Sequence, residues 1–243
     1  MAAPHPLFDP AWYVRSFQAF GQVDEPPLVH YLRFGKDCAV SPHPLFDEAY
    51  ARRASGNANG AALLAYVAAG AEAVFDPHPL FRNTYYREAL GAPLDRGTTP
   101  LEHHLRQSPT TAPHPLFDAA WYHTRHAGAF DASVAPLLDY VASGGVRDPH
   151  WIFNTAYYLA KRDPIRATPL ADYVLSPRGK VPSPNPWFDG RWYLAQNRDV
   201  DDSGIEPLEH YVCHGRFAGL APHPKLSGMV LGPEGPVPRG GEG

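Results

Sequence analysis

The sequence predicts an all-α protein, a solenoid-like array of six helix-loop-helix repeats of ~36 residues with proline-rich connections. Three observations support this fold class. A nine-residue pattern returns at a near-constant period, each copy carries the signals of a helix N-terminus, and each is followed by a second apolar segment that usually begins with proline. Most of the 28 prolines fall at fixed repeat positions, so we interpret them as marks of helix boundaries.

The recurring pattern is first seen at residues 5–13, with the sequence HPLFDPAWY. It returns, with substitutions, at starts 35 to 38 residues apart: His43, His78, His114, His150, Asn185 and, in a shortened form, His223. We therefore expect repeats at 1–42, 43–77, 78–113, 114–149, 150–184 and 185–222. Together they predict one array over residues 1–225, followed by a disordered Gly/Pro tail over residues 226–243.

The first helix of each repeat is expected directly after the HPLF segment. Asp9 is placed as the N-cap, and Pro10 suits the first helical position. Phe8 and Tyr13 have the spacing of a hydrophobic staple across that N-terminus. The same arrangement predicts caps in the other repeats at Asp47, Asp118, Asn154 and Asp189.

Two repeats depart from this pattern. In repeat three Arg82 holds the cap position, so Asn83 is expected to cap the helix one residue later. In repeat two Ala51 replaces the staple tyrosine, which predicts a less well anchored first helix.

The second helix is expected to be about two turns long, because Leu28 and Leu32 are four residues apart and share one helical face. Gly35, Gly70, Gly144 and Gly215 lie where a left-handed residue would end it. Such short helices are marginal alone, so each pair must bury its apolar face against the next. We expect two sets of buried residues: Phe8, Phe46, Phe81, Phe117, Phe153 and Phe188, and Leu28, Leu63, Leu101, Leu137, Leu170 and Leu208.

The composition excludes several classes of protein. The formal net charge of −4 and the lack of a basic run argue against a nucleic-acid partner. No segment approaches the ~20 apolar residues of a membrane span, and the first repeat begins at once, without a signal peptide. Cys38 and Cys213 lie in unrelated contexts, which indicates free thiols in a reducing compartment. These features predict a cytoplasmic protein without a membrane span.

Metal binding and catalysis have little support in the sequence. The start histidines of repeats one to five, and His223, are too far apart to share one ion, so we assign them to the turn before the helix. His210, Cys213 and His214 share a helix end, but no fourth ligand is evident, and Asp199, Asp201 and Asp202 are interpreted as a solvated turn. No nucleophile elbow or phosphate loop is present. We therefore expect no catalytic residue, metal or cofactor.

Repeat six carries the clearest resemblance to a known family. Its segments NPWFDGRWYLAQNRDV at 185–200 and GIEPLEHYV at 204–212, followed by Gly215, resemble the FDxxWYLxxNPDV…PLxHYLxxG repeats that accompany glycosyltransferases in bacterial surface-polysaccharide proteins, including rhamnan-synthesis-like ones. The resemblance extends over residues 5–222. It implies a module associated with a glycosyltransferase, without catalytic residues of its own.

The residue before the second-helix aromatic varies in chemistry between repeats. It is His30, Ala65, His103, Asp139, Asp172 or His210, and stacking of the repeats would place these side chains in a row. We therefore predict His30, His103, Asp139, Asp172 and His210 as the binding surface of a non-catalytic scaffold for protein-protein interaction, with a glycosyltransferase as the candidate partner. A solvated face is an equally good interpretation of this row.

Two other functions stay open from the sequence. The first is a glycan-binding module that uses the exposed member of each aromatic pair, of which Trp12-Tyr13 and Trp121-Tyr122 are examples. The second is an enzyme on a closed helical toroid, which would require longer helices than these.

Overall fold

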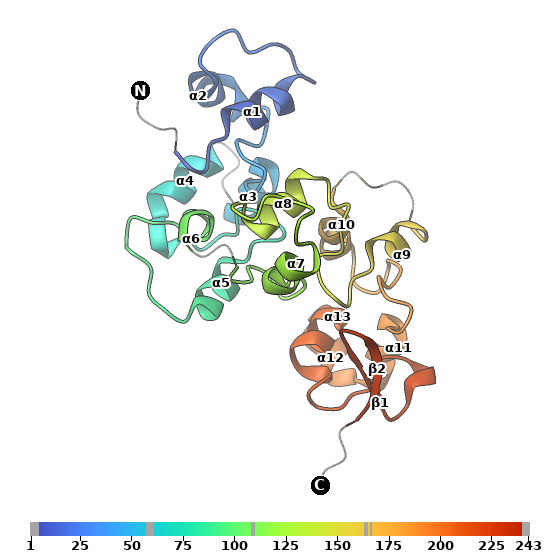
Figure 1. Cartoon of the computed structure of the whole chain (residues 1–243). Coiled ribbons are helices and arrows are strands. Elements are labelled where there is room, and N and C mark those ends of the chain that lie inside the picture. The colour runs from blue at the N-terminus through green and yellow to red at the C-terminus, as the bar shows by residue number, and fades with distance from the viewer. Residues whose placement is uncertain (1–4, 57–60, 108–109, 163–164, 166, 240–243) are drawn as a thin grey trace. The chain divides into compact units, whose positions relative to one another are not determined.

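The computed structural model describes residues 5–56, 61–107, 110–162, 165 and 167–239, and these residues are mostly helical. The predicted helical class is confirmed, whereas the six-repeat solenoid stays a prediction. All six predicted pairs of helices are present, and five of the six second helices begin with proline (Figure 1). The pairs are α1 (Pro10–Phe17) with α2 (Pro27–His30), α3 (Glu48–Ser55) with α4 (Ala62–Ala69), α5 (Asn83–Leu90) with α6 (Pro100–Gln107), α7 (Ala119–Arg125) with α8 (Pro136–Ala142), α9 (Thr155–Leu159) with α10 (Pro169–Leu175), and α11 (Gly190–Gln196) with α13 (Pro207–His210).

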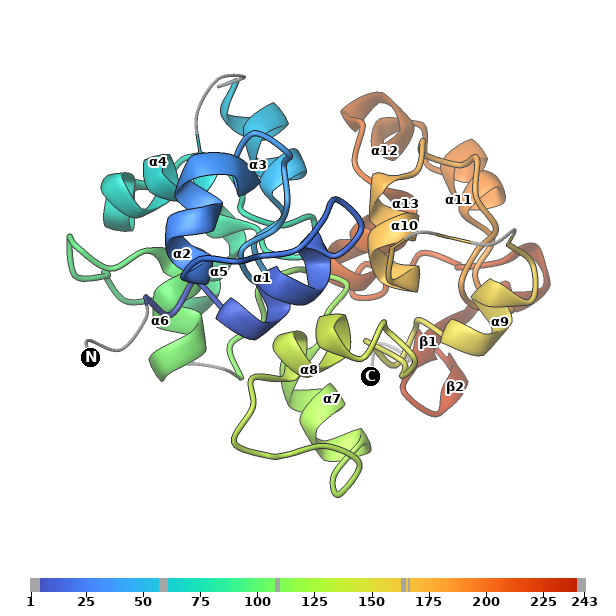
Figure 2. The same ribbon diagram turned by 90° about the horizontal axis from the view of Figure 1, so that it is seen from above.

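The chain forms two compact units where the sequence predicted one continuous array. The N-terminal unit comprises Met1–His114 and Gly128–Ala142, and the C-terminal unit comprises Pro115–Ala127 and Ser143–Gly243. The division separates α7 from α8, which are the two helices of repeat four. Within the N-terminal unit, α1 packs on α2, α3 on α4 and α5 on α6 (Figure 2), and within the C-terminal unit α9 packs on α10 and α11 on α13.

Several elements of the described residues lie outside the predicted pairs. Asp199, Asp201 and Asp202 belong to a helix, α12 (Arg198–Ser203), where the sequence analysis placed a turn. A 3₁₀ turn (Pro224–Leu226) lies at the end of the predicted array, and the tail predicted to be disordered, residues 226–243, forms an antiparallel hairpin of β1 (Met229–Gly232) and β2 (Gly235–Pro238). Leu226 and Leu231 are buried, and apolar contacts of this kind give a Gly- and Pro-rich segment a defined structure. Residues 240–243 lie outside the described residues.

The predicted caps form in five repeats. The side chains of Asp9, Asp47, Asp118, Asn154 and Asp189 each accept a hydrogen bond from a backbone N–H in the first turn of the following helix. In repeat three the prediction for Asn83 is wrong. The helix begins at Asn83 itself and Arg82 makes no capping bond, while Asp76 Oδ1 accepts from the Asn83 N–H at 2.8 Å.

A second cap precedes the start histidine in several repeats. Like Asp76, Ser41 and Asp148 lie seven residues before the first residue of a helix and accept its N–H, at 3.3 Å and 2.7 Å. Two side chains six residues apart thus cap the same helix. In repeat two Ser41 accepts the N–H of the first helical residue and Asp47 accepts an N–H two residues later.

The six repeat phenylalanines are buried as predicted, with at most 3% exposure. Leu63, Leu101, Leu137, Leu170 and Leu208 are buried as well, but the prediction for Leu28 is wrong because its side chain is 41% exposed. Tyrosines are also prominent in the core, and nine of the twelve largest fully buried side chains of the described residues are tyrosines. The second member of each first-helix aromatic pair is fully buried, namely Tyr13, Tyr86, Tyr122, Tyr158 and Tyr193, and the first member of each pair is partly exposed.

The prediction of left-handed glycines holds at two of four positions. Gly70 and Gly144 have positive φ angles, of 55° and 78°. Gly35 and Gly215 instead close short π-helical turns, Tyr31–Gly35 and Tyr211–Gly215. A Cβ atom at either position would lie 2.1 Å from the hydroxyl of a buried tyrosine, so glycine is required there by close packing.

Candidate functional site

The predicted row of variable residues takes part in hydrogen bonds to core tyrosines. The hydroxyl groups of Tyr13, Tyr86 and Tyr193 lie 2.7, 2.8 and 2.8 Å from Nδ1 of a histidine in the same repeat. Those histidines are His30, His103 and His210, three of the predicted binding residues. In repeat five the Tyr158 hydroxyl donates to Asp172 Oδ2 at 2.5 Å.

Four of the five predicted residues therefore accept or share a hydrogen bond inside their own repeat. Asp139, the fifth, is partly buried and also has interactions. Binding of a partner through this row stays a prediction, since hydrogen bonding to a core tyrosine does not test it. What the structure adds is a structural reason for a polar residue at this position.

A signal for this pairing was present in the sequence. Repeat two has Ala51 in place of the first-helix tyrosine, and it also has Ala65 in place of the polar residue. Repeat two thus lacks both the tyrosine and its polar partner, and each of the other repeats has both. This joint change indicates a direct contact, and comparison of the six repeats with one another would have revealed it.

Asp172 has a second partner that affects its charge. Arg162 donates to Asp172 through Nε at 2.9 Å and through a terminal nitrogen at 3.2 Å. Burial raises the pKa of Asp172, but the hydrogen bonds from Arg162 and Tyr158 outweigh it and hold that pKa below its usual value. Asp172 is therefore a carboxylate at neutral pH, engaged with two donors of its own repeat.

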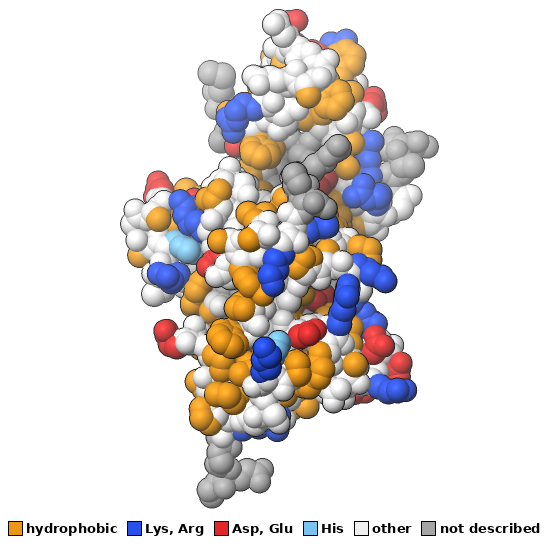
Figure 3. All heavy atoms as spheres, turned by 90° about the vertical axis from the view of Figure 1, so that its right-hand side faces the viewer, with side chains coloured by type: hydrophobic (Ala, Val, Ile, Leu, Met, Phe, Trp, Pro, Cys, Tyr) orange, Lys and Arg blue, Asp and Glu red, His pale blue; other side chains and the backbone are white. Residues whose placement is uncertain are grey.

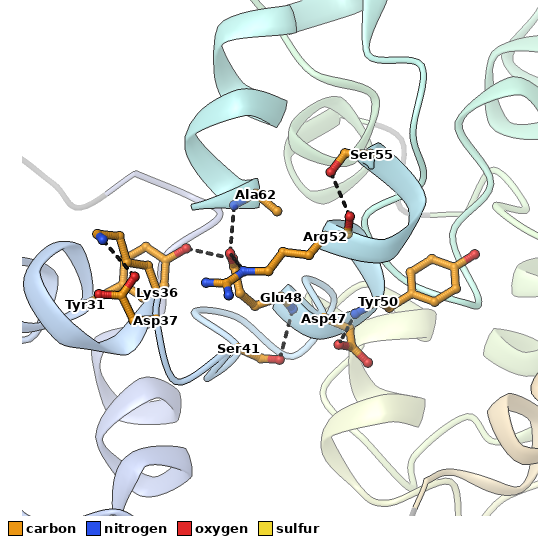
Figure 4. A network of polar contacts seen from close by, with 10 residues as sticks. All are labelled: Tyr31, Lys36, Asp37, Ser41, Asp47, Glu48, Tyr50, Arg52, Ser55 and Ala62. Atoms are coloured by element: carbon orange, nitrogen blue, oxygen red, sulfur yellow. Dashed lines mark hydrogen bonds and ion pairs between the residues drawn. The ribbon is translucent and has the colours of Figure 1, made fainter. Parts of the chain in front are cut away.

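The second-helix tyrosines connect one repeat to the next. Tyr31 donates to Glu48 Oε2 and Tyr66 to Asn83 Oδ1, both at 2.7 Å, and each acceptor is the first residue of the next repeat's first helix. Figure 4 shows the fully buried Glu48, which also accepts from the Ala62 N–H at 2.7 Å and from Arg52 Nε at 3.1 Å. Three donors of the protein thus engage this buried carboxylate, so we assign Glu48 a structural role.

The start histidines also have a structural role. Nδ1 of His43, His78 and His150 accepts the N–H of the residue two positions later, at 3.0, 3.1 and 3.2 Å. Burial lowers the pKa of His43 and of His78 to about 4, and that of His150 to about 3. These side chains are therefore neutral acceptors that hold the turn before the helix, in agreement with their assignment from the sequence.

The His210, Cys213 and His214 cluster gains no further ligand in the structure. The rings of His210 and His214 are 5.4 Å apart, and Nδ1 of His210 is already occupied by the Tyr193 hydroxyl. Over the described part of the chain, no group of three or more His, Cys, Asp or Glu side chains is placed to hold a metal ion.

One pocket is not accounted for by the repeat pattern. It has a volume of about 440 Å³ and lies in the C-terminal unit, between repeats five and six. In the equivalent place Glu48 and Asn83 accept a hydrogen bond from the preceding tyrosine, but repeat six has Gly190 there, without a side chain. The preceding tyrosine, Tyr173, donates instead to Glu206, and space remains beside Gly190.

Glu206 is the carboxylate at this pocket. It precedes α13, and its Oε2 accepts the Glu209 N–H at 2.8 Å while Oε1 accepts from Tyr173. Burial raises the pKa of Glu206 to about 7. A raised carboxylate pKa beside a pocket is a feature of functional sites, although the same geometry serves here as a helix cap.

Figure 3 draws the side chains of one face by type. Lysine and arginine side chains are scattered among hydrophobic ones, and carboxylates lie between them. Among the described residues, no helix is long and apolar enough to cross a membrane, in agreement with the prediction of no membrane span.

Comparison of the chain with protein-family models, with curated proteins and with solved structures finds no match.

Proposed function

We propose that this chain is a non-catalytic helical repeat scaffold that acts by binding a protein partner. The observation that supports the proposal is an uncovered repeat surface at the start of α2. The leucine at the second position of the second helix is at most 4% exposed in repeats two to six, but Leu28 in repeat one is 41% exposed. Val29 and Leu32, on the same short helical segment, are 43% and 36% exposed.

The reason for this difference lies in the contacts between repeats. In repeat three the backbone N–H of Leu101 donates to the Tyr66 hydroxyl of the preceding repeat at 3.3 Å. Leu101 is fully buried there. Among the described residues no tyrosine hydroxyl accepts the Leu28 N–H, and the Leu28 side chain is exposed where the equivalent leucines of repeats two to six are buried.

The partner that fits this surface is a helical protein with an aromatic residue, of the kind that precedes a repeat within this chain. Exposed apolar patches of this type are typical of protein-protein interfaces. The resemblance of repeat six to modules beside glycosyltransferases makes an enzyme of bacterial surface-polysaccharide assembly the candidate partner, and a cytoplasmic location is part of this proposal.

Site-specific photo-crosslinking in the organism that makes the protein tests the proposal. A benzophenone amino acid replaces Leu28 in the full chain, and cross-linked products are identified by mass spectrometry. The matched control carries it at Leu64, which is 52% exposed on the second helix of repeat two. We expect one predominant protein product from position 28 and none from position 64. Equal products from both positions would show that this surface is not an interface.

A glycan-binding module is the second candidate, and one observation favours it. The first member of each aromatic pair, including Trp12, Trp121, Tyr157 and Trp192, is partly exposed, and such rings are able to stack on sugar rings. Binding of purified protein to a glycan array, lost on Trp121→Ala and retained on Leu28→Ser, would favour this function over the scaffold.

A further inference from the structure

The pocket between repeats five and six offers more hydrogen-bond donors than the fold uses. Several of its polar side chains are already engaged: Asp189 accepts from the Trp192 N–H at 3.0 Å, Asn185 accepts from the Trp187 N–H at 2.8 Å, and Ser183 donates to the carbonyl of Asn185 at 3.2 Å. These groups explain the local structure and leave little capacity for a ligand.

The basic side chains of the pocket are different. Lys180 is exposed, and no hydrogen bond or ion pair among the described residues involves its ammonium group. Arg191 uses Nε to donate to the carbonyl of Gly179 at 3.0 Å, and its two terminal nitrogens have no acceptor in the part of the chain that the structure describes. One hydrogen bond thus holds the Arg191 guanidinium in place, and its terminal nitrogens keep their capacity to donate to a ligand.

A third positive charge lies on the same lining. The ammonium group of Lys161 is 3.9 Å from the centroid of the Tyr157 ring and bonds to its hydroxyl. The two carboxylates of the lining, Asp189 and Glu206, each already accept a backbone N–H at a helix start. The donors of the pocket that no described residue engages are therefore the ammonium group of Lys180 and the terminal nitrogens of Arg191, both exposed, and their complement is an anion with several acceptor oxygens.

We propose that this pocket binds the carboxylate or phosphate group of a small ligand, with Lys180 and Arg191 as the donors. The volume of about 440 Å³ is within the range of small-molecule sites, so a ligand larger than a bare anion fits. Tyr157 and Phe188 provide apolar surface for its uncharged part. This site is independent of the Leu28 surface and of the proposed protein partner.

Isothermal titration calorimetry on the full chain tests the site with four probes: inorganic phosphate, glucose 6-phosphate, glucuronate and neutral glucose. We expect binding of at least one anionic probe at concentrations up to about 10 mM, and none of glucose. Glucuronate alone would identify a carboxylate ligand, and the two phosphate compounds alone a phosphate ligand. Equal binding of glucose, or no binding of any anion, would overturn the proposal.

Substitutions then locate the binding. Lys180→Ala changes an exposed, unengaged side chain, so we expect the fold to be intact and the Kd to rise about tenfold. Arg191→Ala should have a similar effect, with the thermal melt as a check because its bond to Gly179 is lost. The matched control is Lys225→Ala, an exposed lysine that does not line the pocket. An unchanged Kd in Lys180→Ala and Arg191→Ala, or an equal rise in Lys225→Ala, would show that this pocket is not the site.

Discussion

At the residue scale, several repeats begin with a side chain that accepts a hydrogen bond without carrying a charge. Histidine fulfils this at His43, His78 and His150, where Nδ1 accepts the N–H two residues later. Asn185 fulfils it in repeat six, where Oδ1 accepts the Trp187 N–H at 2.8 Å. The two residue types are interchangeable because both place one acceptor at the same distance from the backbone.

The buried histidines predict a pH dependence of stability. Burial lowers the pKa of His78 to about 4, whereas a histidine in an unfolded chain titrates near 6.5. Between these values the unfolded chain binds a proton that the folded chain does not. The contribution to stability is therefore complete above pH 6.5 and is lost as the pH falls toward 4.

The variant His78→Asn tests this dependence. Asparagine keeps the acceptor, as Asn185 shows, but does not titrate. Urea denaturation at pH 7 and pH 5 should show that wild type loses about 2 kcal/mol more than the variant between these pH values. If both proteins lose the same amount, His78 is not the titrating group.

At the element scale, the sequence predicted correctly those helix boundaries that depend on residues close to them in the chain. Most helix starts depend on an Asp or Asn cap or on a proline, within a few residues of the helix, and all six predicted pairs of helices form. The role of His103 was not predicted, because it depends on Tyr86, seventeen residues away on another helix. The hairpin of β1 and β2 was missed for a similar reason, since Leu231 is buried only through contacts beyond its own strand.

The caps give a prediction for individual helices. Asp118→Ala removes the acceptor of the Trp121 N–H, which lies at 2.9 Å, and should lower the free energy of unfolding by ~0.5–2 kcal/mol. Arg82→Ala alters the same position of repeat three, where the side chain makes no capping bond. This substitution should change the free energy of unfolding by less than ~0.5 kcal/mol. Chemical denaturation measures both values. Equal losses at the two positions would contradict the assigned caps.

The π-helical turn Tyr31–Gly35, at the end of the second helix of repeat one, gives another prediction. A Cβ atom at Gly35 would lie 2.1 Å from the hydroxyl of Tyr13, whose ring is fully buried and whose hydroxyl lies 2.7 Å from His30. Gly35→Ala should therefore lower stability by ~1–3 kcal/mol through overpacking. Gly97→Ala is the control, because its Cβ atom would meet nothing within 4 Å. Similar melting temperatures for the two variants would show that Tyr13 is free to move.

At the scale of the whole molecule, successive repeats are joined by the same backbone bond. The N–H of the cap residue donates to the carbonyl of the proline before the next repeat, as from Asp47 to Pro77 at 2.9 Å and from Asp189 to Pro222 at 2.9 Å. After repeat six the hairpin takes the place of a next repeat, because the Leu231 N–H donates to the Tyr211 hydroxyl at 2.7 Å. Stability in such a chain is the sum of repeat and neighbour terms.

The division into two compact units leads to a prediction about cooperativity. Phe46 is fully buried in the N-terminal unit, so Phe46→Ala should cost ~3–5 kcal/mol there. If the units open separately, native-state hydrogen exchange should accelerate at least about a hundredfold for amides of α3 and α4. Amides of α11, in the C-terminal unit, should keep the wild-type rate. The reciprocal variant Phe188→Ala should give the opposite pattern, since Phe188 is buried in the C-terminal unit. Equal acceleration of both units in either variant would instead show that all six repeats unfold as one array, as the sequence alone predicts.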